Sequence, residues 1–392
     1  MKNQYRFARR TNWEMSDNPL SLALKKRREQ GLTIFDLTES NPTRAGIDYP
    51  PELFLGVFNN RENLIYAPEP TGLLKARQAV AAYFARRGVT LPAEQVALTA
   101  SSSEAYSFLF RLLADPGDKV LLPAPSYPLF AYLADINDVQ PVYYHLCFDG
   151  LRWELDLDSI AKAAKAGNVK AVVLVSPNNP TGSYLSEAEL KTLNALCARY
   201  GMAIISDEVF SDYLFPANRA AYRSLALNSE VLSFALGGLS KALALPQMKL
   251  GWIAANGPAD VLKEALARLE VITDTFLSVN TPVQHACIDW LPKAGIIQGQ
   301  VMQRVAANLQ FLNQAAEAAG HYVYPVDGGW YAVLRLELNE PEDEWAVRLL
   351  NETGVHVHPG FYFDFETEGH IVLSLLTSPE TFHQGVVFLL KF

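Results

Sequence analysis

Residues 170–208 read KAVVLVSPNNPTGSYLSEAELKTLNALCARYGMAIISDE, two apolar runs joined by an amphipathic stretch. KAVVLVS and MAIISDE predict buried strands, and SEAELKTLNALCARYG predicts a helix between them. Similar apolar runs lie on both sides of this segment: QVALTA, KVLLPAP, QPVYYH and VLSFAL. Alternating helices and near-continuous apolar strands predict an α/β fold, in which a large domain holds a mostly parallel sheet covered by helices on both faces.

The two ends of the chain predict a second, smaller α/β domain. The helical stretch GQVMQRVAANLQFLNQAAEAAG (299–320) precedes shorter strands, YAVLRLEL and HIVLSLL, and LSLALKKRREQG (20–31) predicts a helix near the N-terminus. We therefore expect an N-terminal arm and small-domain segment over 1–50, the large domain over 51–295 and the C-terminal small domain over 296–392.

The composition excludes several classes of protein. The 392 residues are 49% hydrophobic and carry a formal net charge of −9, which argues against nucleic acid or an anionic membrane as a partner. The three cysteines are far apart and form no CxxC pair, which argues against a cysteine zinc site and favours a reducing compartment. No apolar run is long enough to span a membrane, so we expect a cytoplasmic protein. We also expect no metal site.

Ligands of open α/β sheets bind beyond the carboxyl ends of the parallel strands, so the residues after each apolar run are candidates. Ser101–Ser103 precede a predicted helix and could bind a phosphate, although helix capping by Ser101 and Glu104 explains them equally well. Tyr127 could stack on a planar ring, although ordinary loop packing is the more common role.

Three further strand ends carry polar side chains. The turn PNNPTG holds two amides that could bind a ligand oxygen or simply stabilise the turn. Asp207 and Glu208 could bind a cationic group, or Asp207 could cap a helix. Lys241 follows two glycines among small and apolar residues, where lost hydration would make its amine a nucleophile that forms Schiff bases.

Together these positions match the needs of one cofactor, pyridoxal 5′-phosphate. It requires a phosphate site, a stacking aromatic, an amide for its phenolic oxygen, a carboxylate for its ring nitrogen and a Schiff-base lysine. Each signal is modest alone, and their joint placement at strand ends makes the prediction specific.

The chain also resembles a known family along nearly its whole length. SPNNPTG, SDEVF, and LSK followed eight residues later by a basic residue and GW are similar to the motifs of fold-type I, class I/II pyridoxal-phosphate aminotransferases. The resemblance implies a transaminase that moves an amino group between an amino donor and a keto acid acceptor. A β-lyase on the same fold and a non-catalytic cofactor-binding protein are the alternatives.

Matching positions imply individual roles. Lys241 resembles the lysine that forms the Schiff base and moves the substrate's α-proton, and Asp207 resembles the partner of the ring nitrogen. Asn179 resembles the donor to the ring oxygen, and Tyr127 the stacking aromatic. Tyr66 resembles a tyrosine that reaches the cofactor phosphate of a neighbouring subunit, which implies a homodimer with shared active sites. The implied phosphate ligands are Ser102, Ser103, Ser240 and Lys249.

Four departures from the family pattern accompany these matches. Phe210 stands where a tyrosine is usual, Lys249 where an arginine is usual, and Gly238 where a serine is frequent. Val372, in IVLS, replaces the arginine that clamps the substrate carboxylate. We expect Arg44 to bind that carboxylate instead, and the alternative is that Arg44 is an exposed loop residue. A separate alternative is a substrate that carries no carboxylate at this place.

Overall fold

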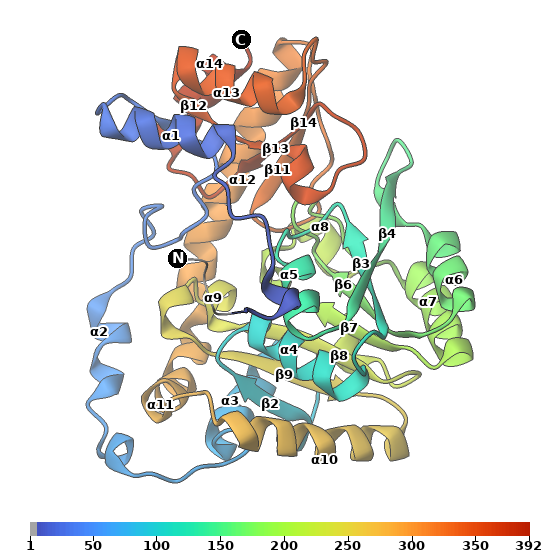
Figure 1. Cartoon of the computed structure of the whole chain (residues 1–392). Coiled ribbons are helices and arrows are strands. Elements are labelled where there is room, and N and C mark those ends of the chain that lie inside the picture. Colours follow the sequence, from blue (N-terminus) through green and yellow to red (C-terminus); the bar gives the residue numbers. More distant parts are fainter. Residues whose placement is uncertain (1–5) are drawn as a thin grey trace.

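The computed structural model describes residues 6–392 and has an eight-stranded sheet at its centre (Figure 1). The strand order is β2-β9-β8-β7-β6-β3-β4-β5, with parallel pairing from β8 through β4. β9 is antiparallel to both neighbours, and β5 is antiparallel to β4. The predicted α/β fold with a mostly parallel sheet is thereby confirmed. The strands are β2 (Val96–Thr99), β3 (Lys119–Ala124), β4 (Gln140–Phe148), β5 (Trp153–Leu155), β6 (Val169–Val175), β7 (Ala203–Asp207), β8 (Ser233–Gly238) and β9 (Gly251–Asn256).

Helices cover both faces of this sheet, because the apolar strands alternate their side chains between two cores. Ala203 and Ile205 of β7 pack with one core, which includes residues of α4, α5 and α10. Ile204, between them, packs with the other core, which includes residues of α6 and α7. The helices around the sheet are α3 (Leu74–Ala85), α4 (Ser102–Leu113), α5 (Phe130–Ile136), α6 (Leu157–Ala166), α7 (Glu187–Tyr200), α10 (Ala259–Phe276) and α11 (Thr281–Trp290).

The predicted helix between the first two quoted strands is α7, and its ends follow from the sequence. Ser186 caps the amide of Glu189 while the Glu189 carboxylate accepts from the Ser186 amide, a reciprocal capping box. Gly201 ends the helix at φ +68°, in the left-handed region that glycine adopts without strain. The helix thus returns the chain to β7, whose last residue is Asp207.

A four-stranded antiparallel sheet of order β10-β11-β14-β13 forms the upper part of Figure 1. The N-terminal segment joins this part, since β1 pairs with β12 in parallel and Phe35 lies opposite Val355. The division at residues 50 and 295 stays a prediction. The elements are α1 (Pro19–Glu29), β1 (Phe35–Asp36), α12 (Ala294–Ala318), β10 (Tyr322–Val323), β11 (Tyr331–Arg335), α13 (Glu342–Thr353), β12 (Val355–His356), β13 (His358–Pro359), β14 (His370–Ser374) and α14 (Pro379–Leu389).

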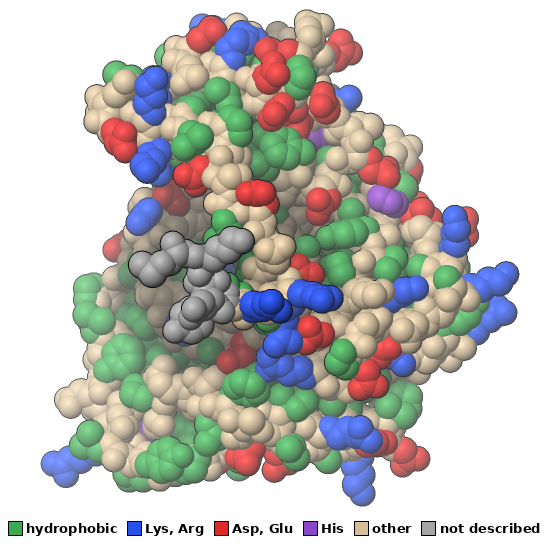
Figure 2. Space-filling model, in the orientation of Figure 1, with side chains coloured by type: hydrophobic (Ala, Val, Ile, Leu, Met, Phe, Trp, Pro, Cys, Tyr) green, Lys and Arg blue, Asp and Glu red, His purple; other side chains and the backbone are tan. Residues whose placement is uncertain are grey.

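Charged side chains of both signs are interspersed over the face shown in Figure 2. Some basic side chains gather near its middle, and others lie at the upper left and along the right and lower edges, among scattered acidic ones. Within residues 6–392, none of the helices combines the length and apolarity needed to cross a membrane.

Candidate active site

The carboxyl ends of β6, β7 and β8 lie level at one edge of the large sheet. Asp207, the last residue of β7, is paired in register with Val175 of β6 and Leu236 of β8. Asn179 follows β6 by four residues and Lys241 follows β8 by three. The topology therefore brings to one sheet edge three residues that the sequence predicts to bind one cofactor.

Lys241 lies in the short helix α9 (Leu239–Ala242), beneath aromatic rings. Its Nζ is 4.6 Å from the ring centroid of Trp330 and 5.2 Å from that of Phe210. Burial lowers the pKa of the Lys241 amine to about 8, although the negative charge of Asp207 opposes the shift. A lysine whose pKa lies near neutral pH has a substantial fraction of unprotonated amine. The unprotonated amine is the nucleophilic form.

Asp207 is buried and accepts two hydrogen bonds. The Tyr106 hydroxyl donates to Oδ2 at 3.1 Å, and the Val209 amide donates to Oδ1 at 3.1 Å. Burial raises the pKa of Asp207 to about 6, while these hydrogen bonds and the Lys241 charge lower it. A buried carboxylate with a cationic neighbour is suited to bind a second cationic N–H group.

The neighbouring acid, Glu208, turns away from the site. Its carboxylate accepts from the Ser224 hydroxyl at 2.6 Å and from the Leu225 amide at 2.7 Å. Glu208 thus fixes the segment after β7 and is a structural residue. Of the two acids in the SDE motif, Asp207 is the one that faces Lys241.

The two amides of PNNPTG also divide their roles. Asn178 Oδ1 accepts from the backbone amide and hydroxyl of Thr181, so Asn178 stabilises the turn. Asn179 Oδ1 is buried and has no hydrogen-bond partner among the described residues. Since an amide can present either its oxygen or its NH₂ after a flip, an unsatisfied Asn179 is suited to a ligand's phenolic oxygen.

Two of the candidate phosphate ligands lie at the start of α4. Ser102 and Ser103 are its first residues, where backbone N–H groups are free to bind an anion. Ser101 caps the helix, since its Oγ accepts a hydrogen bond from the Glu104 amide at 3.2 Å. This capping is the alternative role that the sequence predicts for Ser101. Gly251 is paired with both Thr99 and Gly238, which places this helix start near the segments of Ser240 and Lys249.

Tyr127 lies near Asp207, whereas Arg44 is in an exposed turn. Tyr127 is 40% exposed, and burial together with the charge of Asp207 raises its pKa, so it lies near that carboxylate. Arg44 is exposed in a turn, where its backbone amide donates to Asn41 O. Within residues 6–392 no hydrogen bond or ion pair joins its side chain to the candidate site. The role predicted for Arg44 therefore stays a prediction.

Val372 is buried in β14, opposite Val333 of β11 and His358 of β13. It packs with Val333 and Phe363 in a small apolar cluster. A guanidinium is therefore absent from this strand position, and an apolar surface takes its place.

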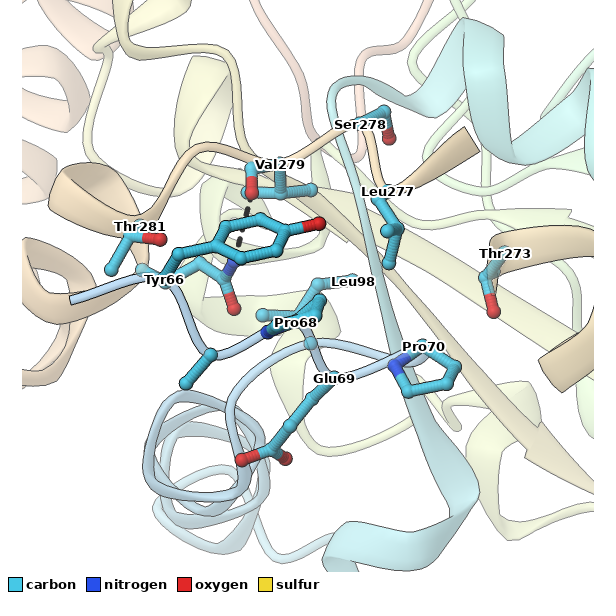
Figure 3. A pocket seen from close by; sticks show the side chains of 13 residues that line it. Tyr66, Pro68, Glu69, Pro70, Leu98, Thr273, Leu277, Ser278, Val279 and Thr281 are labelled. Atoms are coloured by element: carbon cyan, nitrogen blue, oxygen red, sulfur yellow. Dashed lines mark hydrogen bonds between the residues drawn. The ribbon is translucent and has the colours of Figure 1, made fainter. Parts of the chain in front are cut away.

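Tyr66 lies apart from these residues, on the surface. It is 82% exposed and lines a pocket with Ser278 and Gln284, across which its ring extends in Figure 3. Inside the pocket, Gln284 Nε2 donates to Val279 O at 2.8 Å. The Ser278 hydroxyl donates to Glu104 Oε2 at 2.6 Å, so this pocket borders the start of α4.

Three aromatic residues near the site were not predicted from the sequence: Tyr106, Trp330 and Tyr331. The signal for the last two is the glycine pair in DGGWY (327–331). A Cβ on Gly328 would lie 2.9 Å from Tyr213 O and 3.0 Å from Leu214 Cα, so only glycine allows this approach. The close approach brings Trp330 from the smaller sheet to Lys241.

Taken together, the residues fit pyridoxal phosphate. The site offers a lysine of lowered pKa, a buried carboxylate, an unpartnered buried amide and a helix start with hydroxyl side chains. These groups correspond to the aldehyde, ring nitrogen, phenolic oxygen and phosphate of that cofactor.

Comparison with known proteins agrees with this chemistry. Residues 45–386 match the family model "Aminotransferase class I and II". Glutamate-pyruvate aminotransferase AlaA of Escherichia coli (strain K12) is 29% identical over 270 residues, covering 68% of this chain and 66% of AlaA. Mouse tyrosine aminotransferase is 27% identical over 376 residues, covering 90% of this chain and 79% of that protein.

Among solved structures, an alanine aminotransferase from Pyrococcus furiosus superimposes with a TM-score of 0.88. It covers 99% of both chains at 24% sequence identity, and it therefore supports the fold. Since the family model spans most of the sequence, the chain belongs to the class I and II aminotransferases, a family that depends on pyridoxal phosphate.

Proposed function

We propose that this protein is a pyridoxal-phosphate-dependent aminotransferase that moves an amino group from an amino donor to a keto acid, with Lys241 as its catalytic residue. The observation that carries the proposal is the placement of Lys241, Asp207 and the unpartnered amide of Asn179 at one edge of the large sheet. The pKa of Lys241 is lowered to about 8 and that of Asp207 is raised to about 6. Groups with perturbed pKa values cluster at functional sites.

The cofactor, when bound, supplies the electron sink that makes removal of the α-proton feasible. Lys241 in its neutral form would accept that proton at Nζ as a general base, and the resulting ammonium would release it again as a general acid. Asp207 holds the ring N–H as an ionised acceptor, and Asn179 binds the phenolic oxygen. Ser102, Ser103, Ser240 and Lys249 hold the phosphate beside the start of α4. Trp330 and Phe210 limit the access of water to Lys241.

The test is a spectroscopic screen of amino donors against the purified holoenzyme. Transamination consumes the visible band of the cofactor, releases a keto acid and is reversed by adding a second keto acid. Release of ammonia and pyruvate from a sulfur amino acid would establish a β-lyase instead. No reaction across a broad panel of amines and amino acids, with cofactor bound, would establish a non-catalytic binding protein.

For the substrate carboxylate we propose Arg44 as the clamp. The support is chemical: Val372 provides no charge in β14, and Arg44 is an exposed residue of ESNPTRAG. This segment resembles the N-terminal segment that lies over the active site in the family. A bidentate guanidinium–carboxylate pair gives both binding energy and orientation.

Arg44→Ala should reduce kcat/KM for carboxylated donors by about 10²-fold and leave simple amines unaffected, because only the former lose a charge-assisted pair. Steady-state kinetics with both donor classes measures this, and Arg199→Ala on the exposed surface of α7 is the matched control. Equal activity of Arg44→Ala and parent toward carboxylated donors would refute the clamp. Preference of the parent for amines without a carboxylate would show that no clamp is needed.

We also propose a homodimer that shares its active sites through Tyr66. The support is a group of exposed apolar side chains around the pocket of Figure 3 and over α2 (Pro51–Phe54), where hydrophobic residues gather at the lower left of Figure 2. Exposed apolar surface of this kind is typical of subunit interfaces. The residues are Leu55, Leu64, Ile65, Tyr66, Phe276 and Leu277.

Tyr66→Phe should weaken cofactor binding about tenfold, since a hydrogen bond to a charged phosphate is lost. Mixing Tyr66→Phe subunits with Lys241→Ala subunits separates two geometries. If Tyr66 acts across the interface, each mixed dimer contains one site with both Lys241 and Tyr66 and regains parent-like affinity there. If affinity stays at the Tyr66→Phe level, Tyr66 acts within its own chain and the shared-site proposal is wrong.

The three-part domain division and the cytoplasmic location remain proposals from the sequence. The first is supported by the pairing of β1 with β12, which joins the N-terminal segment to the C-terminal part. The second rests on the three cysteines, each of which is free.

A further inference from the structure

Tyr106 carries a buried hydroxyl that no step of the proposed reaction uses. It lies on α4, and only 2% of its surface is exposed. Its hydroxyl donates to Asp207 Oδ2 at 3.1 Å, across 101 positions of sequence. A buried tyrosine hydroxyl needs a partner, and here the partner is the carboxylate that would bind the cofactor ring.

Aromatic packing fixes the direction of this hydroxyl. The Tyr106 ring meets Phe130 edge to face, with centroids 5.2 Å apart at 79°, and meets Phe110 at 6.0 Å. Phe130 also contacts Tyr127 edge to face, with centroids 6.1 Å apart. Rings held on two sides have little freedom to turn, so Tyr106 presents its hydroxyl to Asp207 in one orientation.

The Asp207 carboxylate depends on few groups. The donors and charges that face it are the Val209 amide after β7, Lys241 of α9, Tyr127 after β3 and Tyr106 of α4. Lys241 is the group that would be bound to the cofactor, and Tyr127 is raised in pKa and therefore neutral. With the cofactor in place, Tyr106 and the Val209 amide remain as the neutral hydrogen-bond donors to Asp207.

We propose that Tyr106 is a positioning residue, which holds the Asp207 carboxylate ionised and oriented toward the ring nitrogen of the cofactor. The proposal rests on the proposed function. Hydrogen bonds to the charged form of a buried acid favour that form, so the Tyr106 hydroxyl opposes the effect of burial on Asp207. Without it, the buried Oδ2 would lose the hydrogen bond that it accepts from Tyr106.

The experiment compares Tyr106→Phe with Tyr144→Phe in the holoenzyme. Tyr144 is a matched control, since it is also buried and its hydroxyl donates at 2.8 Å to Val173 O and not to Asp207. Both variants lose one buried hydrogen bond and should lose similar thermal stability. Only Tyr106→Phe should change the cofactor: its dissociation constant rises several-fold, and the pH midpoint of the visible band moves upward. The upward shift is expected because a less ionised Asp207 leaves the ring nitrogen less protonated.

The kinetic expectation is a tenfold or greater fall in kcat with KM changed less than threefold, because Tyr106 does not touch the substrate. Equal cofactor affinity, titration midpoint and kcat in Tyr106→Phe and Tyr144→Phe would overturn the proposal. Incorporation of 3-fluorotyrosine at position 106 keeps the shape of the ring and strengthens the donor, and it should move the midpoint downward. An unmoved midpoint in that variant would also overturn the proposal. The affinity and titration measurements need no turnover, so they test Tyr106 even if the proposed reaction fails.

Discussion

Replacement of Lys241 by alanine is expected to lower the rate of amino transfer by at least about 10⁴-fold, the full contribution of a general acid–base group. The variant loses the amine that binds the cofactor covalently and the group that moves the α-proton. The phosphate and ring contacts remain, so the variant should still bind the cofactor, without the absorbance of the Schiff base. Single-turnover kinetics and absorption spectra of the loaded variant measure both effects.

Lys263→Ala, an exposed position on α10, is the matched control and should behave like the parent in both measurements. Survival of the Schiff-base absorbance in Lys241→Ala would assign covalent binding to another lysine. Activity within tenfold of the parent would show that Lys241 does not move the proton. Either result would refute the assignment of Lys241.

Asp207→Asn should have opposite effects on activity and on stability. Amino transfer should fall by about 10²–10³-fold, because a neutral amide cannot stabilise the cationic ring N–H as a carboxylate does. The cofactor-free protein should become more stable at pH 8, since the variant no longer buries a charge. A pKa raised from 3.8 to about 6 corresponds to a gain of at most about 3 kcal/mol in the free energy of unfolding.

The pH dependence of this gain follows from the direction of the shift. The folded pKa of Asp207 is raised, so its stabilising contribution is fully present below pH 3.8 and is lost as the pH rises through about 6. Lys241 has a lowered pKa, and its contribution is lost as the pH falls through about 8. Thermal unfolding of cofactor-free parent and Asp207→Asn at pH 5 and pH 8 should therefore show a difference that is larger at pH 8. A difference independent of pH, or a destabilised variant at pH 8, would contradict this account.

The large sheet could be predicted from the sequence because most of its parallel strands are apolar runs separated by amphipathic helices. β9 was not predicted as a strand, although it lies between β2 and β8. It follows Lys241 after a short irregular segment with no long helix between, and it pairs antiparallel. A prediction based on alternating strands and helices therefore misses an antiparallel strand of small residues such as Ala254 and Ala255.

The candidate site shows the same limit. The proximity of Lys241, Asp207 and Asn179 could be predicted, because each lies at or just beyond the end of its own strand and these strand ends meet at one edge. Trp330 comes from the other sheet, and only the close passage of Gly328 past Tyr213 brings it there. In the sequence, Tyr106 resembles an ordinary core residue on the apolar face of a helix. Its hydroxyl donates to Asp207, which is 101 positions away, so no local sequence pattern predicts this contact.

Phe130 links these predictions to the design of new variants. Its ring touches Tyr127 on one side and Tyr106 on the other. Substitutions at neighbouring, mutually packed positions do not combine additively. Laboratory evolution toward new substrates would therefore meet strong epistasis among these three positions, and single-site libraries there would give misleading rankings. Val372 packs in another cluster with Val333 and Phe363, and the Ser126 amide, next to Tyr127, donates to Phe363 O at 2.9 Å. Changes at that strand should therefore be varied together with Tyr127 rather than ranked alone.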